Sequence, residues 1–176
     1  MTTEDTLRRA ARVRLMIFDV DGVLTDGSLH YGEDGESMKT FNVHDGLGIK
    51  LLQESGVQTA IISARRSPIV ARRAADLGIS HVHQGGHDKL TPFRALLETT
   101  GLSAEQCGFI GDDVVDLPIL ARVGFAVSVP NGRDDVRNRA HHVTQAGGGR
   151  GAVREVCELL LRAQGNYDSV LAQFLV

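Results

Sequence analysis

The sequence predicts an α/β fold, in which a Rossmann-like parallel sheet carries helices on both faces and one domain spans residues 1–176. Short apolar runs, such as residues 15–18, alternate along the chain with segments whose apolar residues recur at helical spacing. The length of 176 residues suits one domain with a full core. We find neither an internal repeat nor a low-complexity linker, so we expect no second domain.

The first half of the chain contains the first predicted strand, a hairpin, and then helices that alternate with strands. Residues 2–14 form a polar arm, and the apolar run at 15–18 is typical of a strand buried on both faces, although a buried helix has the same composition. Residues 28–41 alternate around an Asp-Gly turn, which indicates a β-hairpin. The other elements expected here are a helix at 44–54, a strand at 57–62, a helix at 68–77, a strand at 81–83 and a helix at 89–100.

The second half of the chain continues the same alternation. The glycine-rich loop at 147–151 lacks the Lys-Ser/Thr ending of a nucleotide-binding loop, so we interpret it as a tight turn near the active-site end. Residues 164–176 follow the last helix as a tail. The elements expected here are strands at 107–110, 125–129 and 142–144, and helices at 117–123, 134–140 and 152–163.

Composition and charge indicate which kinds of binding partner and which cellular location to expect. The formal net charge is -3 and no run of basic residues occurs, so we expect no nucleic-acid or anionic-membrane binding. No apolar run approaches the length of a membrane span, and the polar first residues lack a signal core, so we expect a cytoplasmic protein. Cys107 and Cys157 lie far apart in apolar contexts, which favours two buried free thiols over a disulfide or a metal site.

Two carboxylates follow the first predicted strand. Asp19 ends the strand, Asp21 comes two residues later, and Gly22 lets the chain turn away without strain. In open α/β sheets, ligands bind in the crevice beyond the carboxyl ends of the strands. Carboxylates this close repel each other unless a cation or a shared proton intervenes, and Mg²⁺ is the usual cation beside phosphate. Taken alone, this motif could equally be an ordinary Asp-Gly turn.

Two more segments bring polar side chains to strand ends or helix starts. Ser63 ends a strand, where its hydroxyl can donate to a phosphoryl oxygen or cap the next helix. Arg65 suits a substrate carboxylate or phosphate, with the surface of a helix as the alternative. Lys89 begins a helix, where a cation is unfavourable unless an anion lies nearby. A phosphate beside Asp19 would supply that anion, and an ordinary surface lysine is the alternative.

A second acidic cluster, Gly-Asp-Asp-Val-Val-Asp, follows the strand at 107–110. Asp112 is placed to join Asp19 at a metal ion, and Asp113 lies in the surroundings of that metal. Asp116 lies one turn further on, where it can hold a metal-bound water or pair with the lysine at 89. A solvated acidic turn is the alternative, but the strand delivers the cluster to the same sheet edge as the first two segments.

Together, in order, the four segments resemble the four motifs of the haloacid dehalogenase superfamily, most of whose members are phosphohydrolases. The resemblance implies a Mg²⁺-dependent phosphomonoesterase in which Asp19 is the nucleophile and Asp21 is the acid and base. It also implies that the Asp19 carboxylate, the Asp21 backbone carbonyl and the Asp112 carboxylate hold Mg²⁺. Ser63 and Lys89 would then bind the phosphoryl oxygens.

Residues 41–49 and 148–157 resemble one branch of that superfamily, the cap-less 3-deoxy-D-manno-octulosonate 8-phosphate phosphatases, although Ala64 stands where such enzymes usually have glycine. This resemblance implies hydrolysis of an eight-carbon sugar-acid phosphate in lipopolysaccharide precursor biosynthesis. Two alternatives stay open. One is a phosphatase for a nine-carbon sugar-acid 9-phosphate, or the related domain attached to sialic-acid cytidylyltransferases. The other is a non-catalytic oligomerisation domain, which the four intact motifs disfavour.

The hairpin at 28–41 bears on assembly. The chain between it and the next strand holds one helix and leaves no room for a cap domain, so we expect the hairpin to be a flap over the Asp19 crevice. An isolated two-stranded hairpin is marginally stable in water, so this one needs a surface to pack on. Because the related enzymes are tetramers whose flaps contact neighbouring subunits, the resemblance implies a homotetramer. The apolar residues in 170–176 could also pack against a neighbour.

Overall fold

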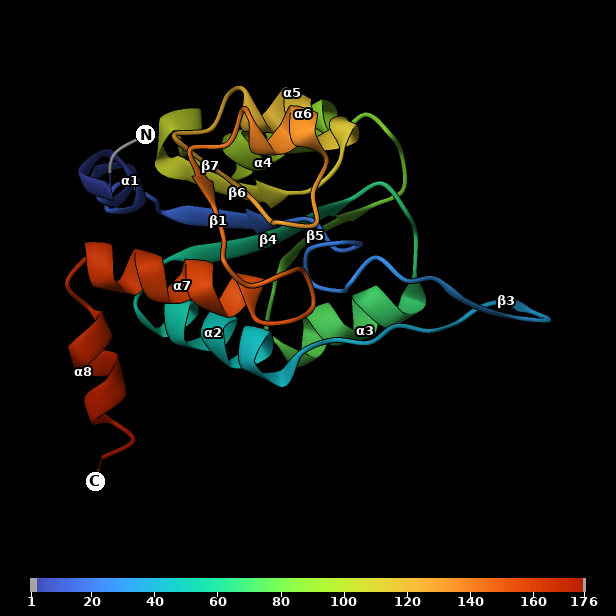
Figure 1. The fold of residues 1–176 in the computed structure, drawn as a ribbon, viewed down its shortest axis with the longest axis horizontal. Coiled ribbons are helices and arrows are strands. Elements are labelled where there is room, and N and C mark those ends of the chain that lie inside the picture. The colour runs from blue at the N-terminus through green and yellow to red at the C-terminus, as the bar shows by residue number, and fades with distance from the viewer. Residues whose placement is uncertain (1–2, 176) are drawn as a thin grey trace.

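The fold is built on a six-stranded parallel sheet, seen in a computed structural model that describes residues 3–175 (Figure 1). The strand order is β5-β4-β1-β6-β7-β8, so β1 lies inside the sheet between β4 and β6. This arrangement confirms the predicted parallel α/β fold. The strands are β1 (Leu15–Phe18), β4 (Gln58–Ser63), β5 (His81–Gln84), β6 (Cys107–Gly111), β7 (Phe125–Ser128) and β8 (His142–Val143).

Helices cover both faces of the sheet (Figure 1). One face carries α2 (Val43–Glu54), α3 (Pro68–Asp76) and α7 (Ala152–Ala163), and the other carries α4 (Leu90–Thr100), α5 (Leu117–Leu120) and α6 (Asp134–Arg137). Two separate apolar clusters, one against each group of helices, form the core. The remaining elements are α1 (Thr3–Ala10), α8 (Tyr167–Ala172) and the 3₁₀ turns η1 (Ala104–Gln106) and η2 (Val114–Asp116).

The central strand β1 is buried because both of its faces are covered. All four of its residues are buried, which confirms the strand and removes the buried-helix alternative. In the register, Phe18 of β1 lies beside Ile61 of β4 and Ile110 of β6. Since the three strands are parallel, their carboxyl ends meet at one edge of the sheet, and the residues that follow them lie close together.

The predicted elements are present, with small differences at their ends. The helix at 117–123 ends at Leu120 and the helix at 134–140 ends at Arg137, because each closes in a turn before the next strand or loop. The polar arm contains α1, which packs on α7, and the tail contains the short helix α8. Residue 2 of the arm and residue 176 of the tail lie outside the described residues.

The predicted hairpin is formed by β2 (His30–Gly32) and β3 (Gly35–Met38), which make an antiparallel sheet of their own. It leaves the molecule at the carboxyl edge of the large sheet and projects away from the body (Figure 1). The base of the hairpin borders the site, because Lys39 pairs there with Asp21. The hairpin, which we expected to cover the Asp19 crevice, therefore extends outward from the rim of that crevice.

The glycine-rich loop at 147–151 packs against the turn that follows β1. The backbone N–H of Gly149 donates to the carbonyl of Val23 at 2.8 Å. A Cβ atom on Gly148 would lie 1.8 Å from the Gly22 carbonyl oxygen, so only glycine permits this approach. The loop is thus a tight turn near the active-site end, as predicted.

Two of the expectations from composition are also tested by the structure. Both cysteines are buried and free, which confirms the prediction of two buried free thiols. Within residues 3–175, none of the helices combines the length and the apolar character that crossing a membrane would require.

Candidate active site

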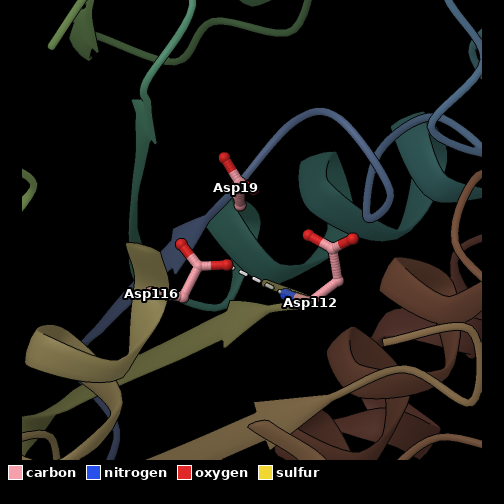
Figure 2. A group of neighbouring side chains, drawn as sticks. All are labelled: Asp19, Asp112 and Asp116. Atoms are coloured by element: carbon pink, nitrogen blue, oxygen red, sulfur yellow. Dashed lines mark hydrogen bonds between the residues drawn. The ribbon is translucent and has the colours of Figure 1, made fainter. Parts of the chain in front are cut away.

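Three carboxylates converge at the carboxyl edge of the sheet (Figure 2). Asp19 follows β1, Asp112 follows β6, and Asp116 lies in η2, one turn further along the chain. One carboxylate oxygen from each residue lies within 4.8 Å of the others. The structure thus brings together side chains 97 positions apart in the sequence, as the parallel sheet predicts.

A buried lysine holds two of these carboxylates. Lys89, immediately before α4, is 1% exposed, and its Nζ lies 2.8 Å from Asp19 Oδ1 and 2.6 Å from Asp116 Oδ1. Burying an ammonium group is costly unless it is paired and hydrogen-bonded, and the two carboxylates supply both conditions. The surface-lysine alternative is therefore wrong.

Asp116 is a positioning residue whose two oxygens are both engaged. Its Oδ1 accepts from Lys89, and its Oδ2 accepts from the backbone N–H groups of Asp112 at 2.9 Å and Asp113 at 3.2 Å. The side chain is completely buried. These bonds fix both the lysine and the turn that carries Asp112, which leaves Asp19 and Asp112 as the freer carboxylates of the three.

Burial and neighbouring negative charge both raise the pKa of the two freer carboxylates. Burial, reinforced by the charge of Asp116, raises the pKa of Asp19 to about 8 although Lys89 opposes the shift. Burial and the charges of Asp116 and Asp113 raise the pKa of Asp112 to about 7. Burial by itself would lower the pKa of Lys89, but the negative charges of Asp19 and Asp116 outweigh burial and raise that pKa. The site therefore carries more negative charge than one lysine compensates, which suits a divalent cation.

Gly22 allows the two strand ends to come this close. Its φ is +86°, in the left-handed region that glycine adopts readily. A Cβ atom at this position would lie 2.1 Å from Asp112 Oδ2, which is far inside van der Waals contact. Gly22 therefore both turns the chain after Asp19 and leaves space for the Asp112 carboxylate.

A cavity of about 230 Å³ opens above these side chains. Ser63 is 5% exposed and lies at its wall, so the hydroxyl is at the same sheet edge as the carboxylates. The cap alternative for Ser63 is wrong, because Ser67 caps α3 by accepting from the N–H of Val70. The cavity-lining residues include all of the predicted site residues except Asp116, which lies behind them: Asp19, Asp21, Ser63, Arg65, Lys89, Asp112 and Asp113.

Arg65 and Asp113 lie at the rim of the site. Arg65 donates to the Tyr31 hydroxyl at 3.0 Å and to Glu36 at 3.2 Å, so it joins the hairpin to the loop after β4. Asp113 is exposed and caps η2 by accepting from the N–H of Val114 at 2.7 Å. None of the described non-glycine residues has a positive φ, so the backbone at Ala64 is not left-handed. Alanine therefore fits at the position where the resemblance leads us to expect glycine.

Sequence reasoning missed two charged residues of the hairpin that reach the site. Lys39 forms an ion pair with Asp21, and its Nζ also lies 2.9 Å from Glu36. Glu36 in turn accepts from the Ser67 hydroxyl. A single lysine and a single glutamate in an alternating hairpin carry no local signal of burial, so only the fold reveals these contacts.

A buried lysine between carboxylates, a hydroxyl and an arginine surround one cavity at the edge of a parallel sheet. This fold and site define a haloacid dehalogenase-like hydrolase, and residues 73–153 match the family model of that description. The chain is 48% identical to 3-deoxy-D-manno-octulosonate 8-phosphate phosphatase of Yersinia pestis over 94% of its own length and 88% of the relative's. The chain therefore belongs to the 3-deoxy-D-manno-octulosonate 8-phosphate phosphatase family.

Solved structures of similar proteins have the same fold over the whole chain. One is 3-deoxy-D-manno-octulosonate 8-phosphate phosphatase from Moraxella catarrhalis, in complex with magnesium ion, phosphate ion and KDO. It is 44% identical with a TM-score of 0.96, and the match covers 98% of this chain and 99% of that one. A probable phosphatase from Pseudomonas syringae is 50% identical with a TM-score of 0.97, covering 99% of both chains.

Proposed function

We propose that this chain is a Mg²⁺-dependent phosphomonoesterase that hydrolyses 3-deoxy-D-manno-octulosonate 8-phosphate to the free sugar acid and phosphate. The observation that carries the proposal is the buried lysine at 89, which pairs with Asp19 at the floor of a cavity beside Ser63. The similarity to the Moraxella catarrhalis phosphatase, whose structure contains magnesium, phosphate and KDO, supports the choice of substrate.

The reaction that we propose has two steps on the side chains of this chain. The carboxylate of Asp19 attacks phosphorus, the bond from phosphorus to the sugar oxygen breaks, and Asp21 gives that oxygen its proton. Water then attacks the aspartyl-phosphate, Asp21 takes a proton from the water, and the bond between Asp19 and phosphorus breaks. Lys89 and Ser63 bind the non-bridging phosphoryl oxygens during both steps.

The donor set fits a magnesium ion. The carboxylates of Asp19 and Asp112 and the backbone carbonyl of Asp21 would hold it, with Asp116 fixing the turn behind them. Burial, together with the charge of neighbouring carboxylates, raises the pKa of Asp19 and of Asp112, and a cation bound between them would favour their ionised forms. When bound, Mg²⁺ supplies positive charge that shields the phosphoryl group from the attacking carboxylate.

Two rim residues complete the proposed site. Arg65 contacts the substrate, because its guanidinium lies on the cavity wall and can bind the carboxylate of a sugar acid. Asp113 lies beside the metal ligands and adds negative charge near Asp112. Its exposed position suits contact through solvent.

The protein acts in the cytoplasm, in lipopolysaccharide precursor biosynthesis, as a homotetramer; these are further parts of the proposal. Exposed apolar side chains at the hairpin and at the tail support assembly: Tyr31, Met38, Leu171, Phe174 and Leu175. Such side chains in close succession are typical of surfaces that another chain covers.

A panel of sugar phosphates tests the proposal. We expect phosphate release from 3-deoxy-D-manno-octulosonate 8-phosphate that requires Mg²⁺ and is lost in Asp19→Asn, whose amide is a poor nucleophile. Preference for a nine-carbon sugar-acid 9-phosphate would instead indicate the sialic-acid type of substrate. Wild-type protein that releases no phosphate from any substrate with Mg²⁺ would favour a non-catalytic oligomerisation domain.

A further inference from the structure

A buried cation from the hairpin touches the residue that exchanges the proton. Lys39 follows β3, and its side chain is 1% exposed. Its ammonium group pairs with Oδ1 of Asp21 and lies 2.9 Å from Oε1 of Glu36. Lys39 belongs to none of the four sequence motifs, yet its side chain is as little exposed as that of the lysine at 89.

Glu36 fixes the lysine in place. Its carboxylate accepts from the hydroxyl of Ser67, which caps α3, and pairs with Arg65 at 3.2 Å. These contacts tie β3 to the loop after β4 within one chain. Lys39 is therefore held between the anchored Glu36 on one side and Asp21 on the other, with little freedom to follow a substrate.

The two oxygens of Asp21 have different surroundings. Oδ1 receives the buried ammonium group of Lys39, whereas Oδ2 lies 3.5 Å from Nε of Arg65. That Nε has no hydrogen-bond partner among residues 3–175, so it holds Oδ2 loosely. One oxygen of Asp21 is consequently fixed, and the other remains available at the cavity.

We propose that Lys39 is a positioning residue for Asp21. By holding Oδ1, it directs Oδ2 toward the oxygen that leaves from phosphorus. The inference rests on the proposed function, because it requires Asp21 to donate a proton as the bond from phosphorus to the leaving oxygen breaks. A carboxylate that rotates freely spends part of its time misdirected, and misplacement of a catalytic group slows the step that it serves.

The position of Lys39 predicts which substrates depend on it. A sugar or phenol of low acidity leaves only when its oxygen receives a proton, so it needs a well-directed Asp21. A p-nitrophenolate group leaves readily as an anion and needs almost no proton. Loss of Lys39 should therefore slow poor leaving groups far more than good ones.

A series of substituted phenyl phosphates of nearly equal shape measures this dependence, with kcat/KM reporting on the step that breaks the ester bond. In saturating Mg²⁺, Lys39→Met should lose about tenfold or more on unsubstituted phenyl phosphate and under about threefold on p-nitrophenyl phosphate. The plot of log kcat/KM against leaving-group acidity should steepen. Lys39→Arg, which keeps the cation, should recover part of the wild-type slope.

Two further variants keep the test decisive. Glu36→Gln retains the lysine but loosens its anchor, so its slope should lie between those of the wild type and Lys39→Met. Lys50→Met removes an exposed lysine of α2 and should leave the slope unchanged. If Lys39→Met folds poorly, the slopes of log kcat/KM for Lys39→Arg and Glu36→Gln still test the role of Lys39.

The result that overturns the role of Lys39 is an equal loss across the series, or no loss at all. An equal loss would mean that Lys39 supports the fold or the binding of phosphate without directing the proton. Wild-type protein that releases no phosphate from the sugar phosphates or the phenyl phosphates would instead overturn the proposed function. The two failures are therefore distinguishable.

Discussion

The acidic side chains around Asp19 are held in unequal ways, and this inequality assigns them different roles. Asp116 has both oxygens bonded to the protein, whereas Asp112 packs against Gly22 and faces the cavity. A fully bonded carboxylate orients its neighbours, and a freer one can bind a cation. We therefore expect Asp112 to govern the affinity for the metal.

Replacing Asp112 by asparagine should raise the Mg²⁺ concentration at half-maximal activity by about tenfold or more, because even supporting residues of metal sites contribute that much. Titration of activity with Mg²⁺ measures the midpoint. Asp113→Asn is the matched control, since it removes an adjacent but exposed charge and should shift the midpoint less. An unchanged midpoint in Asp112→Asn would remove this residue from the metal site.

The raised pKa values of Asp19 and Asp112 predict how metal binding depends on pH. The pKa of Asp19 is raised to about 8 and that of Asp112 to about 7, both above the ordinary 3.8, so the metal-free folded protein retains protons that the unfolded chain releases. Stability from this source is complete below about pH 4 and falls as the pH rises through about 8. Mg²⁺ competes with these protons, so its binding should strengthen over the same range.

Thermal unfolding with and without Mg²⁺ tests this expectation. The increase in Tm caused by Mg²⁺ should be larger at about pH 8.5 than at about pH 6, because the carboxylates bind metal only when ionised. Asp112→Asn should reduce the difference between the two pH values. A Tm shift that does not change with pH would contradict the assignment of these carboxylates.

At this scale the sequence predicts the residues that occur in motifs and misses those that do not. Asp19, Asp112 and Lys89 follow or precede recognisable elements, so strand order alone brings them together. Lys39 and Glu36 are ordinary residues of a hairpin, and they are buried through contacts with Asp21, Arg65 and Ser67. These partners are distant in sequence, so local pattern does not encode the contacts.

Two turns, more than any helix, shape the active-site edge. The loop at 147–151 lies against the turn after β1, with backbone contacting backbone. The sequence predicts a tight turn here from its glycines, but which partner the turn meets depends on the complete sheet. The same holds for the ends of α5 and α6, whose last residues are set by the turns that follow.

Gly148→Ala should destabilise the protein by about 1–3 kcal/mol or more, because the new Cβ would meet backbone that cannot move aside. The nearest atom is the Gly22 carbonyl oxygen at 1.8 Å. Activity should fall as well, since the turn that follows Asp19 must shift. Urea unfolding and the phosphatase assay measure the two effects.

Gly147→Ala is the matched control for this substitution. Its Cβ would lie 3.3 Å from Oδ1 of Asn131, the side chain that bonds Gly148 and Gly22, so it requires a shift of only a few tenths of an ångström and meets no backbone. We expect a change in the free energy of unfolding within about 0.5 kcal/mol. Equal stability of the Gly148→Ala and Gly147→Ala variants would show that the loop does not press on the turn after β1.

At the scale of the whole molecule, the hairpin and the tail extend from the body and expose apolar side chains (Figure 1). Lys39 anchors the hairpin at its base, and Tyr31 and Glu36 anchor its strands through Arg65, while the tip projects away from the body (Figure 1). In the tail, Phe174 and Leu175 are 59% and 78% exposed. Assembly into the proposed tetramer would cover these side chains.

Deleting residues 30–38 should disrupt assembly and lower activity together, since it removes the projecting strands and also Glu36. Sedimentation velocity of the variant, with its phosphatase assay, measures both effects. Met38→Ser removes an exposed apolar side chain and keeps Glu36 in place, so it should weaken assembly with a smaller effect on activity. A fully active monomer of the deletion variant would contradict a role for the hairpin in either.

The covalent intermediate on Asp19 is the central claim, and trapping it is the most direct test. Asp21→Asn should slow hydrolysis of the aspartyl-phosphate, because the amide cannot take a proton from water. The substrate is p-nitrophenyl phosphate, whose leaving group needs almost no proton, so the variant still forms the intermediate. After mixing with this substrate and Mg²⁺ and quenching in acid, peptide mass spectrometry should find one phosphoryl group on the peptide containing Asp19. Turnover without any phosphorylated peptide, or wild-type activity in Asp19→Asn, would contradict the account.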